Sequence, residues 1–271
     1  MSSQQHQSDT RILDRRTLRL DHRALAALLA PGMSVLDVGC GTGAITRDIA
    51  RVVGPGGHVL GLDRDRGLIE RASAQASAPN LRFAVGDATT LESDEKFDVV
   101  TAARTLQWIA DPREAVLRMA RALKPGGRLV VLDYNHALNK WDPAPPPEFA
   151  EFYSRFLSWR AAQGWDNEMG NRCKALFDAA GLDDVRSESQ DEATVRGAED
   201  FDQRTELWSQ VIANLGPTLE EAGVADASLL ASARRTYDAW RTTTLERHFL
   251  SMTVTTGIAT ECPKSDGASG S

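Results

Sequence analysis

A glycine-rich segment has the residue types and spacing of a ligand-binding loop. Residues 35–38 are an apolar run interrupted by Asp37, and Gly39, Gly41 and Gly43 follow before a helical pattern. Glycines allow a backbone to turn tightly, and they let a ligand approach without obstruction by Cβ atoms. A strand, a glycine loop and a helix in this order predict the binding turn of a cofactor.

The loop alone leaves two kinds of cofactor open. Gly39, Gly41 and Ala44 also satisfy the G-x-G-x-x-G/A fingerprint of dinucleotide-binding enzymes, and Asp63 lies near the distance expected for an acid that binds ribose hydroxyls. A nicotinamide-dependent oxidoreductase therefore has to be weighed. Short-chain reductases of this fold would need a tyrosine followed four residues later by a lysine, and the sequence lacks that pair.

The longer pattern Asp37-x-Gly39-x-Gly41-x-Gly43 resembles the first motif of the class I, Rossmann-like S-adenosylmethionine-dependent methyltransferases. The resemblance covers about residues 35–133 and is closest to the members that act on small molecules. It continues in chain order through further motifs: Asp63 in Gly-Leu-Asp, Asp87 in Val-Gly-Asp-Ala, Phe-Asp-Val-Val at 97–100, Leu-Gln-Trp-Ile at 106–109 with Asp-Pro at 111–112, and Leu-Lys-Pro-Gly-Gly at 123–127.

The resemblance implies S-adenosyl-L-methionine as the cofactor and a role for each motif. Asp37 would face the methionyl amino group, Asp63 would accept hydrogen bonds from the ribose hydroxyls, and Asp87 with the Ala88 amide would read adenine. Arg104 would lie beside the methionyl group. The full set of cofactor-binding residues that the resemblance implies is Asp37, Gly39, Cys40, Gly41, Gly43, Asp63, Asp87, Ala88 and Arg104.

Some of these residues also have structural explanations. Asp37 can brace the loop, and Asp87 can cap a short helix over residues 88–91. Cys40 is best interpreted as a small residue that fits the loop, because nothing in the sequence marks it as a nucleophile with a low pKa.

The acceptor side of the reaction is less defined by the sequence. Methyl transfer is an in-line displacement, so positioning and exclusion of water can supply much of the acceleration, whereas an acceptor hydroxyl would benefit from a general base. His136 follows the apolar run 128–132 and is the candidate base; the alternative is a residue that contacts substrate without moving a proton. The candidate substrate pocket consists of Gln107, Trp108, Tyr134, Phe152 and Phe156, although the aromatic residues could equally be core.

The leading functional hypothesis is an enzyme that transfers the methyl group to an oxygen, nitrogen or carboxylate of a small molecule, for instance in secondary metabolism. Carbon methylation of a quinone-like ring is an alternative, because the motifs also resemble ubiquinone and menaquinone methyltransferases. A non-catalytic adenosyl-binding protein and an NAD(P)-dependent oxidoreductase are further alternatives. The sequence lacks an Asn-Pro-Pro-Tyr string, which argues against amino methylation of DNA or of protein glutamine.

The elements around these motifs predict an α/β fold. Apolar, β-branched runs alternate with helical patterns, which favours a doubly wound, mostly parallel sheet of seven strands with a helical cap inserted after the fifth and sixth strands. We expect a helix over 13–30 stopped by Pro31, a turn at 124–127, and an aromatic helix over 149–159. The predicted strands cover 34–38, 58–63, 81–85, 97–102, 128–132, 185–195 and 248–258, and further helices cover 44–53, 172–180, 201–215 and 227–245.

These elements predict one methyltransferase domain over residues 13–260, with cap elements at about 141–170 and 198–245 and disordered tails at 1–12 and 261–271. The N-terminus lacks the apolar stretch of a signal peptide and no window is long enough for a membrane span, so we expect a cytoplasmic protein. The formal net charge of −7 makes nucleic acid an unfavourable partner.

Cys40, Cys173 and Cys262 are far apart in the sequence, and no ligand spacing predicts a metal site. We expect reduced thiols and no metal. Monomer and homodimer both remain open, as does the identity of the small-molecule acceptor.

Overall fold

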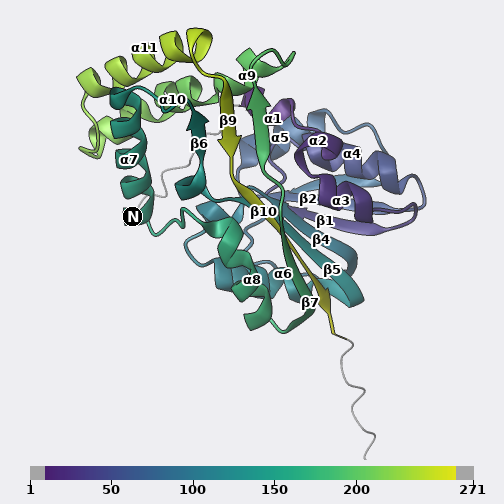
Figure 1. The fold of residues 1–271 in the computed structure, drawn as a ribbon. Coiled ribbons are helices and arrows are strands. Elements are labelled where there is room, and N and C mark those ends of the chain that lie inside the picture. The colour runs from purple at the N-terminus through teal and green to yellow at the C-terminus, as the bar shows by residue number, and fades with distance from the viewer. Residues whose placement is uncertain (1–9, 261–271) are drawn as a thin grey trace, which may run out of the picture.

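The computed structural model describes residues 10–260 (Figure 1). The predicted tails at 1–9 and 261–271, with Cys262, lie outside the described residues. Residues 10–12, which we had also expected in a tail, belong to helix α1 (Thr10–Asp14).

Seven strands form the central sheet in the order β3-β2-β1-β4-β5-β10-β7. The first five in this order pair in parallel, whereas β10 runs antiparallel to both of its neighbours. The predicted doubly wound, mostly parallel sheet is confirmed. The strands are β1 (Ser34–Val38), β2 (His58–Asp63), β3 (Leu81–Val85), β4 (Phe97–Ala103), β5 (Leu123–Tyr134), β7 (Leu182–Ser189) and β10 (Met252–Ala259).

Both faces of the sheet are covered, which explains why its central strands are continuously apolar. Successive strand residues point to opposite faces. Leu36 and Val100 therefore pack on one face with α6 (Pro112–Arg121) and α8 (Met169–Ala179). Val35 and Val99 pack on the other face, and the helices on that side are α2 (Leu18–Asp21), α3 (Arg23–Leu28) and α4 (Ala44–Val53).

Local signals set where several of these helices begin. Helix α6 starts at Pro112, and the Asp111 carboxylate caps it by accepting from the Glu114 N–H at 3.0 Å. Helix α5 (Arg66–Ala74) is capped in the same way by Asp65, which accepts from the Leu68 N–H at 3.1 Å. Helix α5 therefore starts directly after the end of β2, where one of the motifs lies.

The helical cap stands beyond one end of the sheet, at the upper left of Figure 1. Three of its helices share an aromatic core in which Phe149, Phe152 and Tyr237 are fully buried. The rings of Phe149 and Tyr237 stack at a centroid distance of 4.3 Å, so two helices far apart in the chain are joined. The cap helices are α7 (Pro147–Ala162), α9 (Phe201–Thr205), α10 (Leu207–Glu221) and α11 (Ala227–Thr243).

The cap also contains a small antiparallel sheet that we did not predict. Its order is β6-β9-β8, formed by β6 (Lys140–Asp142), β9 (Arg247–Leu250) and β8 (Glu192–Val195). Two predicted strands were therefore wrong as single elements: 185–195 divides into β7 and β8, and 248–258 divides into β9 and β10. In each case one half pairs in the central sheet and the other half pairs in the cap.

At the break between β9 and β10, two backbone N–H groups donate hydrogen bonds to side chains. The Asn139 amide oxygen accepts from the Ser251 N–H at 2.9 Å, and the Asp191 carboxylate accepts from the Met252 N–H at 2.8 Å. Because these backbone donors bond to side chains, the chain can change sheets at this point without leaving them unpaired.

The helix predicted over 13–30 was also wrong as a single element. Thr17 ends one segment and caps α2, accepting from the Leu20 N–H at 3.4 Å, and His22 has a non-helical backbone. The predicted turn at 124–127 falls within the bounds of β5, in the stretch between Leu123 and Arg128 that has no partners on β4. No helix within residues 10–260 is long and apolar enough to cross a bilayer.

His22 gives the fold a pH dependence that can be measured. Its ring is fully buried, its Nε2 lies 3.2 Å from the Thr101 hydroxyl oxygen, and burial together with Arg104 lowers its pKa to about 3. The unfolded chain binds this proton near pH 6.5, so His22 reduces stability as the pH falls below that value. In denaturant titrations, the free energy of unfolding of His22→Gln should fall less steeply with decreasing pH than that of the wild type. The slopes should differ by about 1.4 kcal/mol per pH unit between roughly pH 6 and 4. Parallel curves for the variant and the wild type would contradict the buried neutral ring.

Candidate functional site

A cavity of 630 Å³ lies at the carboxyl ends of the five parallel strands, β1 to β5, and is covered by the cap helix α10. This is where open α/β sheets bind ligands, and the volume is typical of a small-molecule site. Most of the predicted site residues line this cavity: Gly39, Gly41, Asp63, Asp87, Ala88, Arg104, Gln107, Trp108, Tyr134, His136 and Phe156.

The glycine loop requires its glycines for two different reasons. Gly39, Gly41 and Gly43 have φ values of 74°, 56° and 75°, in the left-handed region that other residues rarely adopt. A Cβ added to Gly39 would also lie 2.3 Å from the Thr105 hydroxyl oxygen. The loop backbone therefore packs closely against Thr105, just after the end of β4. Gly43 is the last residue of the loop and directly precedes α4.

Asp63 holds the loop against the end of β2. Its Oδ2 accepts from the Gly41 N–H at 2.9 Å, and its Oδ1 accepts from the Asp65 N–H at 2.9 Å. Burial raises the pKa of this carboxyl above its usual value, and the two backbone donors oppose that rise. A carboxylate oxygen has two lone pairs, so each oxygen retains one for a ligand hydroxyl.

Asp87 and Ala88 lie on the cavity wall at the end of β3. The Asp87 Oδ1 accepts from the N–H and from the hydroxyl of Thr89, at 2.8 and 2.7 Å. Residues 88–90 form a turn rather than a helix, so the structural explanation of Asp87 as a helix cap is wrong.

The structure places Asp37 and Cys40 away from the main cavity. Both line a smaller adjoining pocket of 40 Å³, and the Asp37 Oδ2 accepts from the Thr46 hydroxyl at 2.6 Å. Burial raises the pKa of Asp37 to about 6 and raises that of the Cys40 thiol well above its usual value. Asp37 therefore braces the loop against α4. Gly43 lines neither pocket.

Phe152 is also not part of the cavity wall. It is fully buried in the cap core, whereas Phe156, one turn later on α7, reaches the wall. The expected substrate contact of Phe152 is thus corrected to a packing role.

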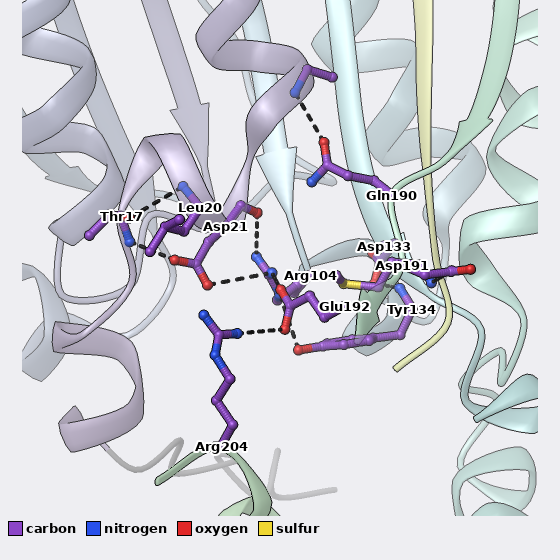
Figure 2. Close-up of polar contacts among 12 residues, drawn as sticks. Thr17, Leu20, Asp21, Arg104, Asp133, Tyr134, Gln190, Asp191, Glu192 and Arg204 are labelled. Carbon is purple, nitrogen blue, oxygen red and sulfur yellow. Dashed lines mark hydrogen bonds and ion pairs between the residues drawn. The ribbon is translucent and has the colours of Figure 1, made fainter. Parts of the chain in front are cut away.

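Arg104 lines the cavity, but its guanidinium group bonds to the protein (Figure 2). Its Nε donates to the Tyr134 hydroxyl at 3.1 Å, and its Nη1 donates to the backbone oxygen of Asp21 at 3.1 Å. Its Nη2 forms an ion pair with Glu192 on β8. Burial alone would lower the pKa of Arg104, but the acidic groups of Tyr134, Glu192 and Asp21 raise it. Arg104 thus joins the N-terminal segment, the sheet and the cap.

Several wall residues were missed by sequence reasoning. Arg16, from the segment between α1 and α2, lines both the main cavity and the smaller pocket. Trp208, Val211 and Asn214 of α10 form part of the opposite wall. The only signal for α10 was its amphipathic pattern, which does not say which face meets a ligand, and nothing local distinguishes Arg16 from its exposed neighbour Arg15.

His136 lies in the wall at the end of β5. Its ring is buried, and it stacks on Tyr134 with centroids 4.9 Å apart. Its Nε2 is 2.6 Å from the Gln107 side-chain oxygen. Burial, together with the charge of Arg160, lowers the pKa of His136 well below its usual value. The ring is therefore neutral at physiological pH.

The sheet departs from the usual dinucleotide-binding topology. The order β3-β2-β1-β4-β5 agrees with the first five strands of that fold, but the next strand is the antiparallel β10, with β7 at the edge. The glycine loop therefore occurs in a different α/β topology from that of nicotinamide-dependent dehydrogenases.

Comparisons with known proteins agree with this topology. Residues 29–181, more than half of the chain, match a family model described as "Methyltransferase domain". The chain is 38% identical to the ubiquinone/menaquinone biosynthesis C-methyltransferase UbiE of Stutzerimonas stutzeri, over 40% of this chain and 44% of that protein. It is 33% identical to a trans-aconitate 2-methyltransferase of Deinococcus radiodurans, over 62% of this chain and 66% of that protein.

An uncharacterized 37.1 kDa protein in transposon TN4556 of Streptomyces fradiae is 39% identical over 47% of this chain and 37% of that protein. The chain thus spans less than half the length of several curated relatives that it matches.

Two solved structures share the fold. The YcgJ protein of Bacillus subtilis superposes with a TM-score of 0.55 and 21% identity, covering 90% of this chain and 98% of that one. The phosphoethanolamine N-methyltransferase 2 of Haemonchus contortus, in complex with S-adenosyl-L-methionine, has a TM-score of 0.54 and 18% identity, covering 88% and 52%. With its family model matched over more than half of its length, the chain belongs to the methyltransferase-domain family, and it has the class I fold that its motifs predicted.

Proposed function

We propose that this protein transfers the methyl group of S-adenosyl-L-methionine to an oxygen, nitrogen or carboxylate of a small molecule. The observation that carries the proposal is the single cavity in which both halves of such a site meet. The glycine loop, Asp63 and Asp87 form its cofactor end, and Trp108, His136 and Phe156 lie toward the cap.

The residues at the cofactor end fit this group. Gly39 and Gly41 present backbone to the cavity without Cβ atoms, which suits a ligand that must lie close to the loop. Asp63 retains lone pairs for the ribose hydroxyls, and Asp87 with the Ala88 amide would hold adenine. When bound, S-adenosyl-L-methionine supplies a methyl group that is activated by a positively charged sulfur.

The acceptor end suits a small molecule held away from water. Its walls combine aromatic rings with the apolar side chains of Val211, Leu215 and Leu250 and the polar amide of Asn214. Positioning and exclusion of water are the contributions that methyl transfer needs most from a protein. The cover provided by the cap favours a small acceptor over a macromolecular surface.

Carbon methylation of a quinone-like ring is the second candidate. The similarity to UbiE proteins supports it, and so do the flat aromatic walls formed by Trp108, Phe156 and Trp208. The atom that receives the methyl group distinguishes the two candidates.

Transfer of isotope from methyl-labelled S-adenosyl-L-methionine tests the proposed function. The purified protein is incubated with fractionated small-molecule extract, and label is followed into products below the cut-off of a filtration membrane. Label in small molecules supports the proposal, and its position on carbon, nitrogen or oxygen selects between the candidates. Tight cofactor binding with no labelled product from any fraction would favour a non-catalytic adenosyl-binding protein.

Asp63 should contribute strongly to cofactor affinity. Charge-assisted hydrogen bonds contribute about 1.5–3 kcal/mol, so Asp63→Ala should weaken S-adenosyl-L-methionine binding by about 10- to 100-fold in calorimetric titrations. Glu114→Gln is the matched control, because Glu114 also lines the cavity but its carboxylate bonds to Arg118 at 2.6 Å. The control should bind like the wild type. If Asp63→Ala and the wild type bind with equal affinity, Asp63 does not bind the ribose hydroxyls.

A further inference from the structure

The two ring nitrogens of His136 have different surroundings. Nε2 lies 2.6 Å from the Gln107 side-chain oxygen, whereas Nδ1 is buried and has no hydrogen-bond partner within residues 10–260. An unpaired polar atom in a buried position costs free energy, so its presence calls for an explanation. His136 is part of the cavity wall, so a bound molecule is the natural partner for Nδ1.

The orientation of the Gln107 amide decides which ring nitrogen carries the proton. The Gln107 amide nitrogen donates to the Arg104 backbone oxygen at 3.3 Å, and its oxygen accepts from the Arg160 Nη2 at 3.1 Å. The oxygen therefore faces His136 and can only accept a hydrogen bond. Nε2 must donate, so it carries the proton, and Nδ1 carries the lone pair.

Arg160 is held rigidly behind this pair. The residue is fully buried, its Nε donates to the Asn167 side-chain oxygen at 2.9 Å, and its guanidinium lies 4.3 Å from the centroid of the Trp108 ring. Its Nη2 also approaches the Gln107 backbone oxygen at 3.4 Å. Arg160 does not line the cavity, so it acts on the site through Gln107 and through its charge.

The groups around the ring keep it neutral. Arg160 and Tyr153 come from α7, and Asp133 and Tyr134 come from β5. The Tyr153 hydroxyl donates to the His136 backbone oxygen at 2.6 Å, and Tyr134 stacks on the ring. Asp133 accepts from the Gln107 N–H at 3.2 Å rather than from the imidazole. Within residues 10–260, no carboxylate forms a hydrogen bond or ion pair with the ring that would stabilise a second proton.

We infer that Gln107 and Arg160 are positioning residues that hold His136 with the Nδ1 lone pair available at the acceptor end of the cavity. The acceptor is then a molecule that presents a proton donor there, an O–H or N–H group, and not a carboxylate. This inference rests on the proposed function and narrows its substrate class. A hydroxylated ring belongs to this class of acceptor, whether the methyl group is transferred to its oxygen or to a neighbouring carbon.

The charges of the wall agree with this class of acceptor. The arginines that line the cavity are Arg16, Arg64 and Arg104. Arg16 adjoins the glycine loop, Arg64 follows the ribose acid, and Arg104 is paired with Glu192. Arg104 is already paired with Glu192 and Arg160 does not line the cavity, whereas a carboxylate at the His136 end would meet the Nδ1 lone pair.

Nitrogen NMR of protein labelled with ¹⁵N-histidine tests the tautomer directly. The ring signals of His136 are assigned with the His136→Gln variant. In the wild type, Nε2 should be protonated and Nδ1 should have the shift of a bare ring nitrogen. Gln107→Leu should give a mixture of both tautomers, whereas Gln107→Glu, which keeps an accepting oxygen, should keep Nε2 protonated. Unchanged His22 and His248 signals show that each variant is folded.

A protonated Nδ1 in the wild type would overturn the inference, and so would a Gln107→Leu spectrum identical to that of the wild type. The wild-type spectrum decides the tautomer even if a variant fails to fold.

The acceptor class is tested with simple probes in the S-adenosylhomocysteine complex. Millimolar phenol should move the His136 Nδ1 signal toward the shift of a hydrogen-bonded nitrogen, and millimolar benzoate should leave it in place. A response to benzoate alone, or to neither probe, would overturn the inference. Failure of the proposed function is a separate result. In that case the wild-type protein would not bind adenosyl ligands or would not transfer label, although His136 would still have the inferred tautomer.

Discussion

Replacing Arg104 with methionine is expected to lower the free energy of unfolding by about 3–5 kcal/mol, because it removes the buried cation that pairs with Asp21 and Glu192. The Arg104 side chain is 2% exposed, and those of its partners Asp21 and Glu192 are each 13% exposed. Methionine keeps much of the apolar volume. It also leaves the backbone cost unchanged, since the φ of 59° at this position is unfavourable for any side chain.

Arg204→Met is the matched control for this variant. Arg204 also approaches Glu192, at 3.5 Å, but its side chain is 31% exposed, so its removal should cost less than about 1 kcal/mol. Chemical denaturation of both variants measures the difference. Equal losses in the two variants would mean that the Arg104 cluster does not hold the N-terminal segment and the cap to the sheet.

Gly39→Ala is expected to lower the free energy of unfolding by about 2–5 kcal/mol and to impair cofactor binding. The left-handed backbone contributes about 1–2 kcal/mol of this loss. The new Cβ, 2.3 Å from the Thr105 hydroxyl oxygen, adds the cost of overpacking, typically about 1–3 kcal/mol. The loop and the end of β4 have to separate to accommodate the methyl group, which changes the cofactor end of the cavity.

Gly32→Ala separates the two contributions. Gly32 also has a positive φ, 86°, but a Cβ there would meet no atom within 4 Å. Its cost should therefore be the backbone strain alone, with cofactor binding unchanged. If both variants lose the same stability and both bind the cofactor normally, the close packing of Gly39 against Thr105 is not needed for the site.

The five parallel strands of the central sheet could be predicted because they are mostly apolar runs of five or more residues separated by turn signals. The small cap sheet could not be predicted in this way. Its strands β6, β8 and β9 have three or four residues, which is too short for a period to be visible, and they pair across more than 50 positions in sequence. The change of sheet at Ser251 depends on Asn139, whose contact arises only in the folded chain.

The site shows the same limit. Asp63 and Asp87 were predicted from the motifs that resemble the methyltransferase family, and His136 was predicted from its place after the fifth strand; all three line the cavity. Asp37 belongs to the glycine-loop motif, but one of its oxygens accepts from the Thr46 hydroxyl on α4, a contact that spacing alone did not reveal.

Packing between distant elements decides the remaining residues. Phe152 and Phe156 lie one turn apart on α7, and only the position of the cap determines which turn reaches the cavity. Arg160 was not predicted, because its effect on His136 passes through Gln107, a residue 53 positions away in sequence.

Calorimetric titration of the wild-type protein with S-adenosyl-L-methionine, S-adenosylhomocysteine and NADH tests the central claim most directly. The proposed function predicts micromolar binding of both adenosyl ligands and no heat of binding from NADH at millimolar concentration. Binding of NADH without binding of either adenosyl ligand would contradict it, because the glycine loop and Asp63 would then hold a dinucleotide.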